Sequence, residues 1–281
     1  MNSTNQQQRL EALYRDWKHL TKFDDIDGFG SPLLLRITDT YTAATNRILV
    51  YGQETRGWSW NAEELRRFSY PQTEWRFSDQ STFSDFLRNS DSVEALVSGY
   101  ERFSFSAHQP VNRRSPFWAA FRQMQGVSDG GVMWSNLVRA DYQDGSILLA
   151  PEQQRQTFLE AQAELLRREL AVLEPNACVF FTGRTYDFIL DQIFGGIQFQ
   201  QAEAEPLNNI ALLSHPNLPI RSYRTYHPSY LRRSRQWRFV DKISRRLARN
   251  ISQRDVVVLL PDLRHLLVAE HAKRPGDAPP R

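Results

Sequence analysis

Ile48-Leu49-Val50-Tyr51-Gly52-Gln53-Glu54 is the stretch of sequence that decides the fold. Its first four residues form an uninterrupted apolar run, which is typical of a strand buried on both faces of a parallel sheet. Gly52 ends this run, and a glycine there lets the backbone approach a ligand closely. The stretch therefore predicts a buried strand with a carboxylate, Glu54, at its carboxyl end.

Three more strands are predicted along the chain, at residues 132–138, 177–181 and 220–226. Helical patterns lie before, between and after the strands, at Arg9–Leu20, after Ser31-Pro32, after Ser115-Pro116, at 152–173, at 185–193 and after His227-Pro228-Ser229. Strands that alternate with helices predict an α/β sandwich with a mainly parallel sheet. In such sheets the functional residues collect at the carboxyl ends of the strands.

The 281 residues are interpreted as a single domain over residues 1–265. This domain has N-terminal helices in 1–45 and a core in 46–250. Residues 266–281 are predicted to be a flexible tail, because proline, glycine and charge dominate the end of the chain. Residues 58–110 are too polar and aromatic to assign, and the apolar run Val256–Leu260 is either a strand or packed coil.

Composition favours a cytoplasmic protein without a membrane segment. The hydrophobic share is 41% and the charged share 24%, and no apolar run approaches the roughly 18 residues that span a bilayer. The N-terminus lacks the basic and apolar pattern of a signal peptide. Cys178 is the one cysteine, so an internal disulfide and a four-cysteine metal site are excluded. Its apolar neighbours predict a buried structural thiol.

Basic residues concentrate between Arg232 and Arg249, where eight of them accompany one acid, Asp241. This block is either a solvated helix face or a surface for an anionic partner. Duplex DNA is the obvious candidate, because it carries one negative charge per roughly 1.7 Å of its axis.

Polar side chains follow the first, second and fourth predicted strands. Glu54 could orient a water molecule, and Asn136 could read the edge of a base through its amide. His227, on a rigid loop with Pro228, could stabilise negative charge on a leaving group. Each of these residues taken alone is more often structural, and only their shared order and spacing point to a function.

That order resembles the uracil-DNA glycosylase superfamily over residues 46–240. The most specific segments are Thr225-Tyr226-His227-Pro228-Ser229-Tyr230-Leu231-Arg232-Arg233 and Met133-Trp134-Ser135-Asn136-Leu137-Val138-Arg139. The resemblance implies a three-layer α/β/α sandwich around a central, mainly parallel four-stranded sheet. It also implies a monofunctional DNA glycosylase, which flips a base out of DNA and hydrolyses its N-glycosidic bond to leave an abasic site.

The resemblance assigns a role to each matching residue. Glu54 and His227 become the catalytic residues. Glu54 would activate the water or stabilise the positive charge on the sugar, and His227 would stabilise the base as it leaves. Leu231 takes the place of the wedge that enters the base stack, which Tyr230 could help or replace. The full binding sets are, for the base, Gly52, Gln53, Thr55, Arg56, Trp58 and Asn136, and, for DNA and the wedge, Ser229, Tyr230, Leu231, Arg232, Arg233 and Arg235.

The sequence departs from the family pattern in three ways. Many members carry a tyrosine after the acid that rejects thymine, whereas Thr55-Arg56 follows here. The acid is Glu54 instead of the more familiar aspartate, and the iron-sulfur cysteines of several branches are absent. Trp58 is either a stacking wall or part of the core. Two identities of the excised base are compatible with the sequence. One is a C5-modified pyrimidine, as in defence against phages, and the other is uracil, as in repair.

We expect a monomer that uses no cofactor or metal and binds duplex or single-stranded DNA. One alternative is a non-catalytic DNA-binding protein on a glycosylase fold. Another is an unrelated α/β hydrolase or nucleotide-binding protein, which the absence of the corresponding glycine and serine motifs disfavours.

Overall fold

A computed structural model describes residues 3–21, 28–55, 58, 82–105, 115–202 and 204–248. Residues Met1–Leu247 cluster into one compact unit, and Ala248–Arg281 form a second unit. Two predictions lie outside the described residues, namely the apolar run Val256–Leu260 and the tail 266–281. Most of the unassigned segment 58–110 also lies outside them.

The fold is α/β, built on a six-stranded, mostly parallel sheet in the order β2-β1-β3-β6-β5-β4. Four neighbouring strands are parallel, namely β2 (Val132–Val138), β1 (Ile48–Glu54), β3 (Ala177–Phe180) and β6 (Arg221–Thr225). The antiparallel strands β5 (Ile210–Ser214) and β4 (Gln198–Gln201) extend the sheet beyond β6. The expected count of four strands is therefore corrected to six.

The two extra strands escaped prediction for different reasons. β4 carries one apolar residue, Phe199, and forms the edge of the sheet, so its sequence has no buried-strand signal. Ile210–Ser214 is an apolar run, but it follows a polar segment and was not recognised as a strand. All five residues of β6 are buried, although two of them are arginines.

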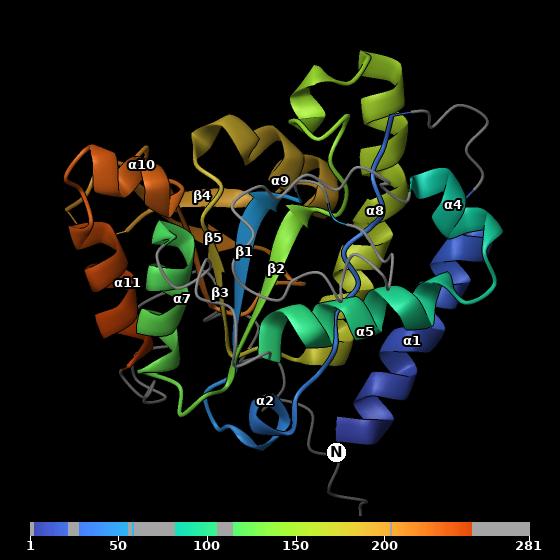
Figure 1. The fold of residues 1–281 in the computed structure, drawn as a ribbon. Coiled ribbons are helices and arrows are strands. Elements are labelled where there is room, and N and C mark those ends of the chain that lie inside the picture. The colour runs from blue at the N-terminus through green and yellow to red at the C-terminus, as the bar shows by residue number, and fades with distance from the viewer. Residues whose placement is uncertain are drawn as a thin grey trace, which may run out of the picture. The chain divides into compact units, whose positions relative to one another are not determined.

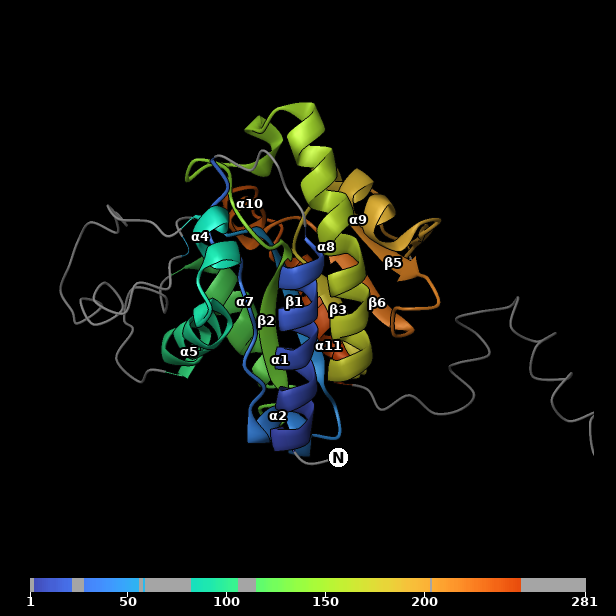
Figure 2. The same ribbon diagram turned by 90° about the vertical axis from the view of Figure 1, so that its right-hand side faces the viewer.

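Helices lie on both faces of the sheet. Those in the described residues are α1 (Ser3–Leu20), α2 (Asp39–Ala43), α4 (Phe83–Arg88), α5 (Ser92–Phe105), α7 (Pro116–Gln125), α8 (Glu152–Leu173), α9 (Asp187–Phe194), α10 (Pro228–Arg233) and α11 (Arg238–Leu247). In Figure 1, α7 and α11 lie to the left of the central strands and α8 lies to the right. Figure 2 shows α1 and α8 side by side in front of the strands. None of the described helices has the length and apolar character needed to cross a membrane.

The helix predicted directly after Ser31-Pro32 is wrong, because residues 31–38 are irregular and the next helix is α2. Side chains of α1 take the place of helical hydrogen-bond partners. The amide of Leu35 donates to the Tyr14 hydroxyl (3.0 Å), and the amide of Ile37 donates to Gln7 Oε1 (2.8 Å). The apolar residues here are buried by tertiary contacts instead of by a helix.

A buried polar network fixes α1 and α8 to the end of β2. Tyr14 donates to Glu169 Oε1 (2.8 Å), and the other Glu169 oxygen pairs with the guanidinium of Arg139. All three side chains are fully buried, so each charge depends on its partner. Arg139 also binds the hydroxyl of Ser135, the residue before Asn136. The predicted burial of the Cys178 thiol is confirmed in β3.

Candidate active site

The polar residues predicted at the strand ends lie along one edge of the sheet. Because β2, β1, β3 and β6 are parallel neighbours, their carboxyl ends meet there. Gly52 pairs with Asn136 across β1 and β2, and Tyr51 pairs with Phe180 across β1 and β3. His227 follows the end of β6, two residues after Thr225. The structure thus brings Glu54, Asn136 and His227 to the same edge.

Asn136 lies directly over Gly52. A Cβ atom built on Gly52 would be 2.4 Å from Asn136 Oδ1, so only glycine leaves room for this amide. Asn136 is 8% exposed, and its side chain makes no hydrogen bond to another described residue. Its amide atoms are not among the fully buried polar atoms that lack a partner, so the amide keeps access to solvent and is open to a ligand.

Phe117 on α7 completes a contiguous group with Asn136 and His227. Its Cε2 atom is 3.4 Å from the Cβ position on Gly52. Its ring is nearly parallel to the imidazole of His227, with centroids 6.1 Å apart and an angle of 10°. Phe117 lies in the helix predicted after Ser115-Pro116, but it was not predicted as a site residue. Its position in the first turn after Ser115-Pro116 was the available signal.

His227 is half-buried at the start of α10. Its Nδ1 accepts a hydrogen bond from the amide of Ser229 (3.2 Å), so the proton of the neutral ring belongs on Nε2. Burial, and then the charge of Arg233, lower the pKa of His227 to about 4. The ring is therefore a neutral hydrogen-bond donor near pH 7, as suits the stabilisation of a developing anion.

Glu54 is held through one of its two oxygens. Its Oε2 accepts from the amide of Ile147 (2.8 Å) and from the hydroxyl of Ser146 (3.2 Å). Tyr186 lies 3.3 Å from the same Ser146 oxygen. Because the Ser146 proton is directed at Glu54, Tyr186 must be the donor to Ser146. Oε1 accepts no hydrogen bond from the described residues and is left for a ligand or water.

Ser146 and Tyr186 were missed by sequence reasoning. Ser146 caps the short 3-10 helix η1 (Ile147–Leu149), and Tyr186 ends the 3-10 helix η2 (Arg184–Tyr186). Their hydroxyls are brought together only by the loops that follow β2 and β3. A serine before a helical turn predicts a cap, but nothing in the sequence connects this cap with Glu54.

The other predicted base-binding residues are hydrogen-bonded or packed within the protein, or they lie outside the described residues. Gln53 donates to the carbonyl oxygen of Thr182 (2.8 Å) and so links the ends of β1 and β3. Thr55 is buried, and its hydroxyl contacts the carbonyl oxygen of Arg139 (3.4 Å). Arg56 lies outside the described residues.

Trp58 belongs to an aromatic cluster and is not an exposed stacking wall. Its ring is edge-on to Phe103 (5.5 Å) and to Trp134 of β2 (6.1 Å). Trp118, beside Phe117 on α7, contacts both Phe103 and Trp134. The cluster joins α5 and α7 to β2 and so supports the face on which Asn136 lies.

The α10 segment places the predicted wedge differently from expectation. Leu231 is 0% exposed, because it lies on the buried side of α10, so it cannot enter a base stack as the helix stands. Tyr230 is 43% exposed, and its ring lies against Tyr226 with centroids 4.6 Å apart. The exposed aromatic residue of this segment is therefore Tyr230, and Leu231 is a core residue.

The predicted basic residues of this segment are exposed. Arg232, Arg233 and Arg235 form no ion pair with a carboxylate of the described residues, and Arg232 lies over the ring of Trp237 (5.4 Å). Further along, Arg238 and Lys242 pair with Glu205. The beginning of the basic block thus keeps its positive charge available for an anionic partner.

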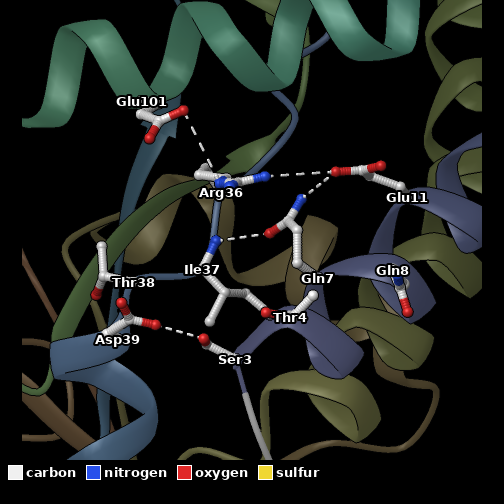
Figure 3. Close-up of a pocket in the computed structure, with 10 residues that line it drawn as sticks. All are labelled: Ser3, Thr4, Gln7, Gln8, Glu11, Arg36, Ile37, Thr38, Asp39 and Glu101. Carbon is white, nitrogen blue, oxygen red and sulfur yellow. Dashed lines mark hydrogen bonds and ion pairs between the residues drawn. The ribbon is translucent and has the colours of Figure 1, made fainter.

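A cavity of about 510 Å³ lies elsewhere, between α1, residues 36–39 and α5 (Figure 3). Its charged groups largely satisfy one another, because Arg36 approaches Glu11 (3.6 Å) and Glu101 (3.9 Å). Gln7 is bound to the amide of Ile37 in its wall. None of its lining residues belongs to the carboxyl edge of the parallel strands, so this cavity is not part of the candidate site.

No group of three or more His, Cys, Asp or Glu side chains within the described residues could hold a metal ion. No protein-family model matches the chain, and no curated protein sequence matches it significantly.

Proposed function

We propose that the chain is a monofunctional DNA glycosylase of the uracil-DNA glycosylase superfamily, with the four parallel strands as the centre of its three-layer sandwich. The observation that carries the proposal is the unpartnered Asn136 amide over Gly52, next to Phe117 and His227. Glu54 offers a free oxygen at the end of the same strand as Gly52. This combination supplies a base reader, a stacking ring, a neutral donor and a carboxylate.

The extruded base would lie against Phe117, with its polar edge on the amide of Asn136. A planar ring beside a bidentate amide suits a nucleobase, because stacking holds the plane and the amide reads the edge. The exposed basic residues of α10 would bind the phosphates of the same strand.

The reaction breaks the bond between the sugar carbon C1′ and the base nitrogen. The electron pair leaves with the base, and Nε2–H of His227 stabilises the resulting anion as a hydrogen-bond donor. Positive charge develops on the sugar, and the Glu54 carboxylate opposes it. Water then adds its hydroxyl to C1′, and its proton passes to Glu54.

Enzymes lower barriers by about 8–23 kcal/mol, and one preorganised donor supplies only about 3–4 kcal/mol of this. The two charged or polar groups are therefore insufficient alone. Holding the extruded nucleotide in a fixed orientation must supply much of the remainder.

The excised base is either uracil or a C5-modified pyrimidine such as a modified cytosine. In many family members the acid is followed by proline and then by the tyrosine that excludes thymine, so Arg56 stands here where that tyrosine would be, and Thr55 before it binds a backbone carbonyl. Base selection of the usual steric kind is therefore weakened at this position. We propose action on DNA as a monomer, either in repair or in defence against phages with modified DNA.

The test is incubation with oligonucleotides that carry uracil, a G·T mismatch, 5-hydroxymethylcytosine or its glucosylated form, followed by hot alkali. Strand cleavage at one base identifies the substrate. Glu54→Gln and His227→Ala should abolish cleavage, whereas Glu152→Gln, which changes an exposed carboxylate on α8, should not. DNA binding without abasic product on every substrate, including phage DNA, would support a non-catalytic DNA-binding protein instead.

A further inference from the structure

Most of the large apolar side chains that are exposed in the described part of the chain follow or adjoin the carboxyl ends of the parallel strands. Five large apolar or aromatic side chains are exposed among the described residues, namely Leu20, Leu149, Phe188, Leu207 and Tyr230. Leu149 follows β2, Phe188 follows β3 and Tyr230 follows β6. Leu207 precedes β5, whose first residue pairs with the last residue of β6. Four of the five therefore surround the edge that carries Asn136 and His227.

Tyr226 and Tyr230 form an ordered aromatic pair at this edge. Gly183 has a φ of +71°, and a Cβ atom there would lie 3.2 Å from Cδ1 of Tyr226, so the glycine lets this ring lie on the backbone. Tyr230 in turn lies against Tyr226 at 4.6 Å, with 38° between the ring planes. One side of Tyr230 is thereby covered, while 43% of the residue stays exposed. The pair presents a supported ring.

Positive charge adjoins this ring, and two carboxylates, Asp187 and Glu205, are paired with cations. Arg232, Arg233 and Arg235 are exposed and have no acidic partner among the described residues. Asp187, at the start of α9, is bound by Arg224 (2.8 Å). Glu205 is occupied by Lys242 and Arg238. The surface therefore combines aromatic faces with uncompensated arginines.

We propose that this surface binds an unpaired DNA strand, with a base next to the extruded one stacked on Tyr230. Aromatic faces beside a basic track are the arrangement that binds single strands, because every unpaired base has an open face. In a duplex those faces are covered by neighbouring bases. Entry into a duplex needs a projecting apolar wedge, and the residue expected to serve, Leu231, is fully buried. The proposal rests on the proposed function for its substrate, DNA, but not on catalysis.

The test measures binding of the full chain to a labelled oligonucleotide of ordinary bases and to its duplex, by fluorescence anisotropy at one salt concentration. We expect the single strand to bind at least about 10-fold more tightly. Tyr230→Ala should weaken single-strand binding by about 5- to 150-fold, as expected for loss of one stacked base, and should leave duplex binding unchanged. Tyr230→Phe should bind like the wild type. Leu20→Ala, which removes an exposed apolar group at the end of α1, is the matched control and should change nothing.

Tyr230→Leu separates stacking from wedging. A leucine can act as a wedge but offers no ring, so the proposal expects it to behave like Tyr230→Ala. Equal or tighter duplex binding by the wild type, equal losses on both forms, or no binding of either form would each overturn the proposal. Tight single-strand binding without base excision on any substrate would refute the proposed function and leave this proposal standing.

Discussion

Replacing Gly52 by alanine tests the candidate site most directly. The new methyl group would be 2.4 Å from Asn136 Oδ1, whereas ordinary contacts of a Cβ atom begin at 3.4 Å. The amide must therefore move by about 1 Å, while Phe117, already at 3.4 Å, need not move. A misplacement of about 1 Å at a positioned group costs on the order of 100-fold in rate. We expect Gly52→Ala to lower the single-turnover rate of base excision by about this factor.

The assay follows release of the base, or of alkali-labile sites, with enzyme in excess over the oligonucleotide that proves active. DNA affinity should change little, because the basic residues of α10 are untouched. A thermal unfolding curve is recorded in parallel, since the overpacking costs about 1–3 kcal/mol of stability. The fold should nevertheless persist at the assay temperature.

Gly126→Ala is the matched control. A Cβ atom at Gly126 would meet backbone oxygens at 3.6 and 3.8 Å, and its φ of −65° suits any residue. This variant should keep full activity and gain about 0.4–1 kcal/mol of stability. An undiminished excision rate in Gly52→Ala would refute the assignment of Asn136 as the base reader. A loss of excision rate that is fully explained by the unfolded fraction of the variant would refute the same assignment.

Three further variants test other parts of the site. Ser146→Ala removes one hydrogen bond from Glu54, so the excision rate should fall on the order of 10-fold while the Kd for DNA stays unchanged. An equal fall in DNA affinity would contradict the role of Ser146 in positioning Glu54. The pKa of His227 is lowered to about 4 in the folded protein, so between pH 6.5 and 4 the unfolded chain binds more protons at this residue than the folded one does. The contribution of His227 to stability is therefore lost as the pH falls through this window. His227→Gln should therefore lose less Tm than the wild type between those pH values, and parallel melting curves would contradict the shift. Leu231→Ala should destabilise the fold by about 2–5 kcal/mol in denaturant titrations, because the side chain is fully buried; an unchanged stability with a loss of duplex activity would restore the wedge role.

Much of the sheet was predictable because apolar runs mark strands buried on both faces. The strands β2, β3 and β6 begin and end within one residue of the predicted limits, whereas β1 continues three residues past Tyr51, where its apolar run ends. β4 could not be predicted, since an edge strand of mostly polar residues lacks that pattern. The segment after Ser31-Pro32 misled for the opposite reason. Its signals for a helix start are genuine, but Tyr14 and Gln7 of α1 bind its backbone in an irregular form.

The site was predictable only where it depends on strand ends. Parallel strands bring their carboxyl ends together, so Glu54, Asn136 and His227 followed from the topology. The partners of Glu54 depend instead on loop geometry, because Ser146 lies 92 residues away and Tyr186 a further 40. Leu231 was predicted to be the wedge from its position in a motif. A motif does not show which side of a short helix is buried. Burial of α10 against the core decided that point.

The place of β1 in the sheet has a consequence for where motion is possible. β1 is paired on both sides by parallel strands, so its amides should be among the last to exchange with heavy water. The pairing with β3 covers Ile48–Tyr51, and Gly52 and Glu54 continue this strand with β2 as their partner. Tyr230 belongs to a six-residue helix at the rim, which can open locally without disturbing them. If the chain binds DNA as proposed, Tyr230 can adjust to the strand while the groups on β1 keep their spacing.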